Sequence, residues 1–150
     1  MSISEHLLQV RDHEAEGYTP VVDFEAWRVA ILNFSSELKA ENICSMQRHN
    51  ETDEVFVLLH GRCILFLGLG DDSVKRVFAV EMQPGKVYNV KRKTWHNHTL
   101  TRDAKVLIVE NRDTTYDNSP FCPLTEAQKL EIMNLTRTLW PRHHDPPFPT

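Results

Sequence analysis

Residues 47–61 read QRHNETDEVFVLLHG and join a polar pair to an apolar run. His49 and Glu54 stand just before residues 55–59, where β-branched, aromatic and aliphatic side chains follow one another without a break. Such a run predicts a β-strand, and Gly61 predicts the hairpin turn that ends it. An imidazole and a carboxylate are therefore expected close together at the start of a strand.

Further strands are predicted on both sides of this stretch. Short β-type segments separated by turn residues occur at residues 27–32, 42–49, 63–67, 74–81, 86–90, 95–101 and 105–110. A series of short strands with regular turns indicates an antiparallel sandwich or barrel, so we expect an all-β core over residues 20–111. Alternation from Glu54 places Phe56 and Leu58 in the interior of this core.

The two ends of the chain predict other structures. Residues 2–12 are expected to form a short N-terminal helix, because their apolar side chains fall on one side of a helical turn pattern. Thr125 and Gln128 fit a capping box, which predicts a C-terminal helix over residues 125–140. The proline-rich tail, residues 141–150, is expected to be flexible.

The length and composition of the chain indicate one domain, residues 1–150, of the ordinary globular class. Hydrophobic residues make up 41% and charged residues 25% of the chain, and the net charge is −4. This balance argues against nucleic acid or an anionic membrane as a partner. No apolar run reaches the length of a membrane span, and the N-terminus lacks a signal-peptide core. Three widely spaced cysteines suggest free thiols, and hence a cytoplasmic location.

Two groups of residues resemble the two motifs of the cupin superfamily. The first motif ends with His, three or four residues, Glu, six residues and Gly, and His49, Glu54 and Gly61 match this half in full. The second motif runs Gly, five residues, Pro-x-Gly, two residues, His, three residues and Asn, and Gly85 and His96 fall at its spacing. The resemblance covers the β core and implies a cupin-type double-stranded β-helix, that is, a jelly-roll barrel.

Several positions depart from these motifs. Glu41 stands where the first motif has its opening glycine, and Gln47 replaces the first histidine of His-x-His. In the second motif Lys91 and Lys93 replace the proline and the glycine, and Leu100 replaces the asparagine. The glycines Gly61 and Gly85 and the strand pattern remain, so the resemblance still implies the fold.

Carried over residue by residue, the resemblance implies that His49, Glu54 and His96 bind a divalent metal ion. Gln47 would be a weak fourth ligand or a hydrogen-bonding group beside the ion. Two imidazoles and one carboxylate form the ligand set of non-haem Fe(II) sites with open positions, and the same set holds Mn, Ni or Zn. His98 shares the face of His96, so it either lines the pocket mouth or faces solvent.

Two functions follow from these residues. The first is a metal-dependent enzyme that acts on a small polar molecule by oxygenation, isomerisation or lyase chemistry, with Glu54 and His96 as catalytic residues. The alternative is a non-catalytic cupin that binds a small-molecule ligand in the barrel, which the departures at Gln47, Lys91 and Lys93 favour. The resemblance also implies a homodimer.

Overall fold

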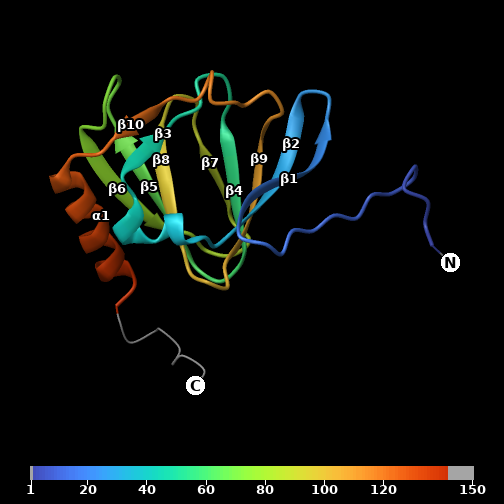
Figure 1. Ribbon diagram of the computed structural model, residues 1–150, viewed down its shortest axis with the longest axis horizontal. Coiled ribbons are helices and arrows are strands. Elements are labelled where there is room, and N and C mark those ends of the chain that lie inside the picture. Colours follow the sequence, from blue (N-terminus) through green and yellow to red (C-terminus); the bar gives the residue numbers. More distant parts are fainter. Residues whose placement is uncertain (1, 142–150) are drawn as a thin grey trace.

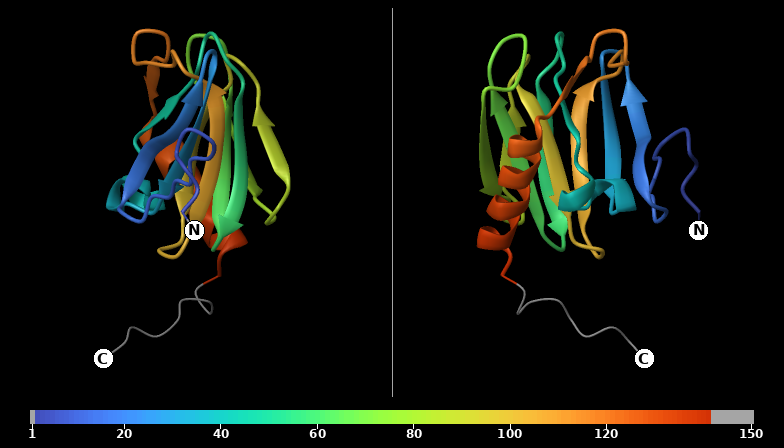
Figure 2. Two further views of the ribbon diagram at one scale, coloured as in Figure 1. Left: turned by 90° about the vertical axis from the view of Figure 1, so that its right-hand side faces the viewer. Right: turned by 60° about the vertical axis from the view of Figure 1, so that its left-hand side comes forward.

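Two antiparallel sheets make up the body of the computed structural model, which describes residues 2–141 (Figures 1 and 2). The strands are β1 (Gly17–Phe24), β2 (Trp27–Asn33), β3 (Ser45–Gln47), β4 (Glu54–His60), β5 (Cys63–Leu69), β6 (Arg76–Glu81), β7 (Val87–Val90), β8 (Trp95–Leu100), β9 (Lys105–Asn111) and β10 (Phe121–Pro123). One sheet has the order β1-β2-β9-β4-β7, and the other has the order β10-β3-β8-β5-β6. The all-β prediction is confirmed.

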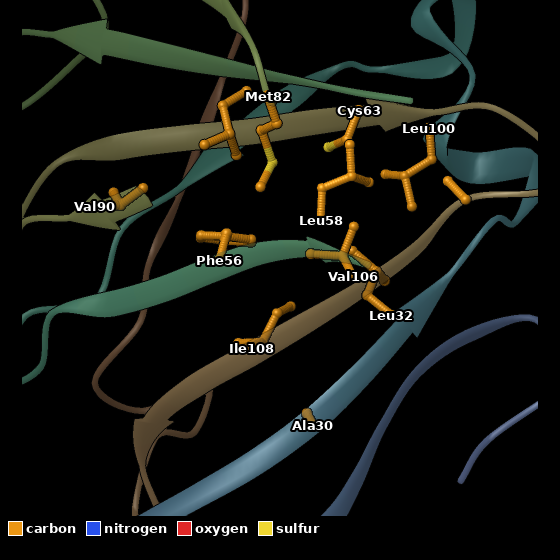
Figure 3. Close-up of a cluster of buried hydrophobic side chains, with 12 residues drawn as sticks. Ala30, Leu32, Phe56, Leu58, Cys63, Met82, Val90, Leu100, Val106 and Ile108 are labelled. Carbon is orange, nitrogen blue, oxygen red and sulfur yellow. The ribbon is translucent and has the colours of Figure 1, made fainter. Parts of the chain in front are cut away.

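A hydrophobic core fills the space between the sheets (Figure 3). Phe56 and Leu58 of β4 and Val106 and Ile108 of β9 are its centre, and each is at most 2% exposed. The cluster is completed by Ala30, Leu32, Cys63, Leu65, Met82, Val90, Leu100 and Ala104. The inward direction predicted for Phe56 and Leu58 is therefore confirmed.

A second core covers the outer face of the β10-β3-β8-β5-β6 sheet, beneath helix α1 (Glu126–Leu139) (Figure 2). Ile64 and Phe66 of β5 alternate with the inward residues of that strand and pack in this outer cluster together with Ile132 of α1. All three are fully buried. Because this sheet is buried on both faces, β5 reads as a continuous apolar run rather than an alternating one.

Helix α1 begins and ends where the sequence predicts. The backbone N–H of Gln128 donates to Thr125 Oγ1 at 3.2 Å, and the N–H of Thr125 donates to Gln128 Oε1 at 3.0 Å. These two bonds form the predicted capping box, which satisfies two backbone donors that the first helical turn leaves free. The helix ends at Leu139, just before Pro141.

The N-terminal part of the prediction is wrong. Residues 2–12 form no helix, only a turn at residues 5–7. Leu7 and Val10 are 83% and 78% exposed, so the apolar side of the expected helix has no surface to pack against. A helix of this length is marginal without such packing.

The limits of the β core also need correction. The sheets extend beyond residues 20–111, because β1 begins at Gly17 and β10 ends at Pro123. Most of the tail that was expected to be flexible, residues 142–150, lies outside the described residues.

The structure also bears on the expected free thiols and on the membrane. All three cysteines are free, and Cys63 and Cys122 are buried. No helix within the described part of the chain has the length and apolar character needed to cross a bilayer.

Candidate metal centre

Three strands bring the predicted site residues to one end of the barrel. Strand β3 ends at Gln47, two residues before His49, whereas β4 begins at Glu54 and β8 begins one residue before His96. Gln47 and His96 are paired residues of β3 and β8. In antiparallel sheets the end of one strand lies beside the start of its neighbour. Residues that are far apart in the sequence therefore meet at a single rim.

His49, Glu54 and His96 form a buried cluster in which one ligand atom of each residue lies within 4.8 Å of the others. Nε2 of His49 lies 2.9 Å from Glu54 Oε2, and Nε2 of His96 lies 2.8 Å from the same oxygen. Both rings thus direct the same type of nitrogen at one carboxylate oxygen. The structure brings together the three residues that the cupin resemblance implied as ligands.

Hydrogen bonds behind the two rings determine which ring nitrogen carries the proton. Nδ1 of His96 lies 2.9 Å from the Thr94 carbonyl oxygen, which can only accept, so this nitrogen is protonated. Nδ1 of His49 lies 2.7 Å from Ser119 Oγ, and that hydroxyl donates to Asn118 Oδ1 at 3.0 Å. The hydroxyl is therefore free to accept from His49. A neutral ring at either position presents an Nε2 lone pair to the site, as metal binding requires.

The orientation of the Asn118 amide supports this assignment. Asn118 Nδ2 donates to the Asp113 carbonyl oxygen at 2.9 Å, and Oδ1 accepts from the Thr115 backbone N–H at 3.0 Å. The amide oxygen, rather than the nitrogen, therefore faces Ser119. A loop far from His49 in the sequence thus holds a hydroxyl behind Nδ1 of that histidine that is free to accept a hydrogen bond.

The charges of the cluster stabilise one another. Burial would raise the pKa of Glu54, but hydrogen bonds from His49 and His96 hold it well below its usual range. Burial would lower the pKa of His96, but the hydrogen bond to Glu54 and its negative charge outweigh burial and raise it. In the absence of a metal ion the cluster is a carboxylate paired with a protonated imidazole.

We expect the stability of chelator-treated protein to show this pairing as a pH dependence. The contribution of Glu54 is complete above its unfolded pKa of 4.5 and is lost as the pH falls through the lower folded value. The contribution of His96 is complete below its unfolded pKa of 6.5 and is lost as the pH rises through the higher folded value. Their joint contribution is therefore greatest between these values.

Urea midpoints measured across this range for wild type and His96→Gln provide the check. The difference between the two proteins should shrink as the pH rises above about 6.5. A difference that is constant with pH would contradict the pairing.

A cavity of about 580 Å³ opens onto the cluster, and its wall includes charged residues that the sequence did not suggest. Glu110 is buried, and Arg28 donates to its Oε1 through Nη2 at 2.7 Å and Nε at 3.1 Å. The Tyr18 hydroxyl donates to the same oxygen. Glu110 Oε2 lies 3.7 Å from His49 Nε2. The candidate centre therefore has a second carboxylate beside it.

Gln47 and His98 also line the cavity. The side-chain amide of Gln47 donates to the Ser119 carbonyl oxygen at 3.0 Å, so its role as a fourth ligand stays a prediction. His98 lies at the pocket rather than in solvent, because its Nδ1 is buried and its ring centre is 5.8 Å from that of Phe56. Burial lowers the pKa of His98 to about 4, so this imidazole is neutral near pH 7.

Comparison with solved structures identifies the architecture. Pac13 of Streptomyces, described as a unique nucleoside dehydratase, has a TM-score of 0.52 over 77% of this chain and 87% of its own, at 8% identity. CapF, a capsular polysaccharide assembling protein of Staphylococcus aureus, has a TM-score of 0.55 over 75% of this chain and 32% of its own, at 12% identity. Both are cupin-type structures. This chain has the cupin fold.

The predicted jelly-roll barrel is thus confirmed. At such identities the likeness concerns the cupin fold alone, and the chain spans about a third of the CapF chain. No family model matches the sequence, and no curated protein matches it.

Two turns at positions that match the cupin motifs have a left-handed backbone conformation. Gly61 has a φ of 69°, and a Cβ there would lie 2.6 Å from Ala104 Cα, so a side chain is excluded. Lys93 stands at the motif glycine and still has a φ of 66°, in the left-handed region that favours glycine. Its N–H donates to the His49 carbonyl oxygen at 2.8 Å. The turn before β8 therefore supports the segment that carries His49.

Register explains why Glu110 and Arg28 escaped the sequence analysis. They are paired residues of β9 and β2, and they share the inward face with Ile108 and Ala30. Opposite charges at inward positions of two predicted strands were a usable signal. That signal required the knowledge that these two strands are neighbours.

Proposed function

We propose that this protein is a metal-dependent enzyme that converts a small polar molecule inside its barrel. The observation that carries the proposal is the pair of histidines whose Nδ1 atoms are bound behind them and whose Nε2 atoms meet Glu54 beside a cavity. Two imidazole nitrogens and a carboxylate oxygen suit Fe, Mn, Ni or Zn. A bound ion would supply Lewis-acid chemistry or activate water or dioxygen.

The protein's own groups support a reaction at this position. The Thr94 carbonyl and the Ser119 hydroxyl orient the two imidazoles, and residues oriented in this way need no rearrangement when a ligand arrives. In the absence of an ion, His96 Nε2 and Glu54 Oε2 at 2.8 Å form an acid–base pair that can give or take one proton.

The polar cavity fits a small ligand. Pac13 has been solved with uridine and CapF with the inhibitor 3-isopropenyl-tropolone, so proteins of this fold bind small organic molecules. In the present chain the exposed rings of Tyr116 and Phe121, with centres 5.9 Å apart, contribute to the cavity wall and offer an apolar surface to a ligand.

Elemental analysis of protein purified without an affinity tag or chelator tests the proposal. Wild type is expected to hold about one divalent ion per chain, and His49→Ala about a tenth of that or less, because it removes one of three ligands. His60→Ala is the matched control, since His60 is exposed and its Nδ1 contacts Asp103, outside the candidate centre. It should retain the ion.

Wild type that binds none of the Fe, Mn, Ni or Zn ions offered would contradict the enzyme proposal. It would favour the alternative, a non-catalytic cupin that binds a small molecule. The observation that favours this alternative is Gln47, whose amide is turned toward the Ser119 backbone. The homodimer and the cytoplasmic location stay predictions.

A further inference from the structure

The carboxylate of Glu110 has one oxygen with several partners and one with none. Oε1 accepts from Arg28 Nη2 at 2.7 Å, from Arg28 Nε at 3.1 Å and from the Tyr18 hydroxyl. Oε2 is buried, and no donor from residues 2–141 reaches it. Buried polar atoms are nearly always hydrogen-bonded, because an unpartnered one loses its hydration without compensation. The lone oxygen therefore points to a ligand.

The neighbours of Glu110 hold this arrangement in place. Arg28 donates to the Arg112 and Thr114 carbonyl oxygens at 3.2 and 3.1 Å, so the guanidinium cannot move to serve Oε2. Burial and the nearby carboxylate raise the pKa of Tyr18, so its phenol keeps its proton and donates it. The two side chains that donate to Glu110, Arg28 and Tyr18, are thus both committed to Oε1.

The unpartnered Oε2 of Glu110 lies where a molecule bound at the candidate metal centre would contact this oxygen. Glu110 Oε2 is 3.7 Å from His49 Nε2, too far for a hydrogen bond between them, and Glu110 lines the cavity. The charged residues in the same wall are Glu37, Glu54, Glu110 and Arg28. Arg28 is engaged by Glu110 and His96 is paired with Glu54, so the described cavity wall offers negative charge and no further charged side chain that could bind an acid.

We propose that Glu110 Oε2 accepts a hydrogen bond from the substrate, and that the substrate is a hydroxyl- or amine-bearing molecule rather than a carboxylate or phosphate. The inference rests on the proposed function, because it concerns the same cavity. A hydroxyl or N–H group donates to Oε2, whereas an ionised acid presents only lone pairs and negative charge to it. Glu110 is therefore a substrate-binding residue that determines specificity.

The substitution Glu110→Gln tests this directly. The donors Arg28 and Tyr18 require an acceptor at the Oε1 position, so the amide oxygen must occupy it. The amide nitrogen then replaces Oε2, which changes an acceptor into a donor and removes one negative charge. The cavity of wild type should prefer ligands that donate hydrogen bonds, and the cavity of the variant should prefer acids.

Matched probe pairs make this preference measurable. D-ribose is compared with D-ribonate and glycerol with glycerate, and binding to each protein is followed by ligand-observed NMR. Wild type should bind the neutral member of each pair at least about tenfold more tightly. Glu110→Gln should weaken binding of the neutral member about ten- to hundredfold and strengthen binding of the acid.

Glu37→Gln is the control for charge alone, because the exposed Glu37 belongs to the same wall and loses the same charge. It should keep the preference for the neutral member. Circular dichroism checks the fold of each variant. If Glu110→Gln does not fold, the preference of wild type between the paired probes decides the question.

Several results would overturn the inference. Wild type that binds the acids as tightly as the neutral probes would do so, and so would wild type that binds neither. An unchanged preference in Glu110→Gln would also overturn it. A fall in the metal content of Glu110→Gln together with the change in binding would assign Glu110 to the metal site instead. Failure of the proposed function appears separately, as absence of metal from wild type, since the probe measurements use no activity assay.

Discussion

A Phe56→Ala variant is expected to lose about 3–5 kcal/mol of unfolding free energy. Phe56 is 1% exposed at the middle of β4, and its ring fills the core between the sheets (Figure 3). The same ring also packs beside the site, with its centre 6.0 Å from that of His96 and 5.8 Å from that of His98. The truncation would therefore leave a cavity in the core directly beside the candidate metal centre.

Urea unfolding of the variant beside Leu59→Ala would check this. Leu59 lies on the same strand but is 51% exposed, so its truncation should change stability by no more than about 0.5 kcal/mol. Equal losses in the two variants, or a loss of less than about 1 kcal/mol for Phe56→Ala, would contradict the packing described for β4.

Glu54→Ala is expected to cost about 3–5 kcal/mol in protein freed of metal, the range found when one partner of a buried ion pair is removed. The carboxylate oxygen that both imidazoles contact would be absent, leaving His49 and His96 buried without it. Metal ions should not restore the loss, because the variant lacks one ligand. Wild type in contrast should gain about 2.7 kcal/mol when the free ion is a hundredfold above its Kd.

Denaturation curves with and without added Zn²⁺ measure both effects. Glu126→Ala is a suitable control, because Glu126 is exposed and its ion pair with Lys129 lies on the surface of α1. It should retain the full response to Zn²⁺. An equal gain from Zn²⁺ in Glu54→Ala and wild type would show that the ion stabilises the protein at another position.

The fold could be predicted where local pattern and tertiary structure agree. In β4 the apolar run, its alternation and Gly61 all indicate the strand that forms. The start of β1 was harder to predict, because its register shifts between Pro20 and Val22 and the alternation breaks there. Residues 2–12 carried a helical pattern with no surface to bury it, and no helix formed.

The site residues likewise fall into two groups, those that the motifs indicated and those that only the folded structure shows. The resemblance to the cupin motifs implied His49, Glu54 and His96, because those motifs record which positions converge. Glu110 could not be found from spacing, since alternation gives the face of a residue but not its neighbouring strand. Ser119 lies in a loop with no regular pattern, so only the folded structure shows its contact with His49.

Strand β8 has consequences for how such a barrel can evolve. His96 faces the cavity, whereas the adjacent Trp95 belongs to the outer core beneath α1. Successive positions of one strand thus have different surroundings, one at the ligand cavity and the next in the core that attaches the helix. A lineage can replace the inward positions and acquire a new substrate while the outward positions keep the sheet folded. Mutant libraries that vary only the inward positions would rely on the same division between inward and outward residues.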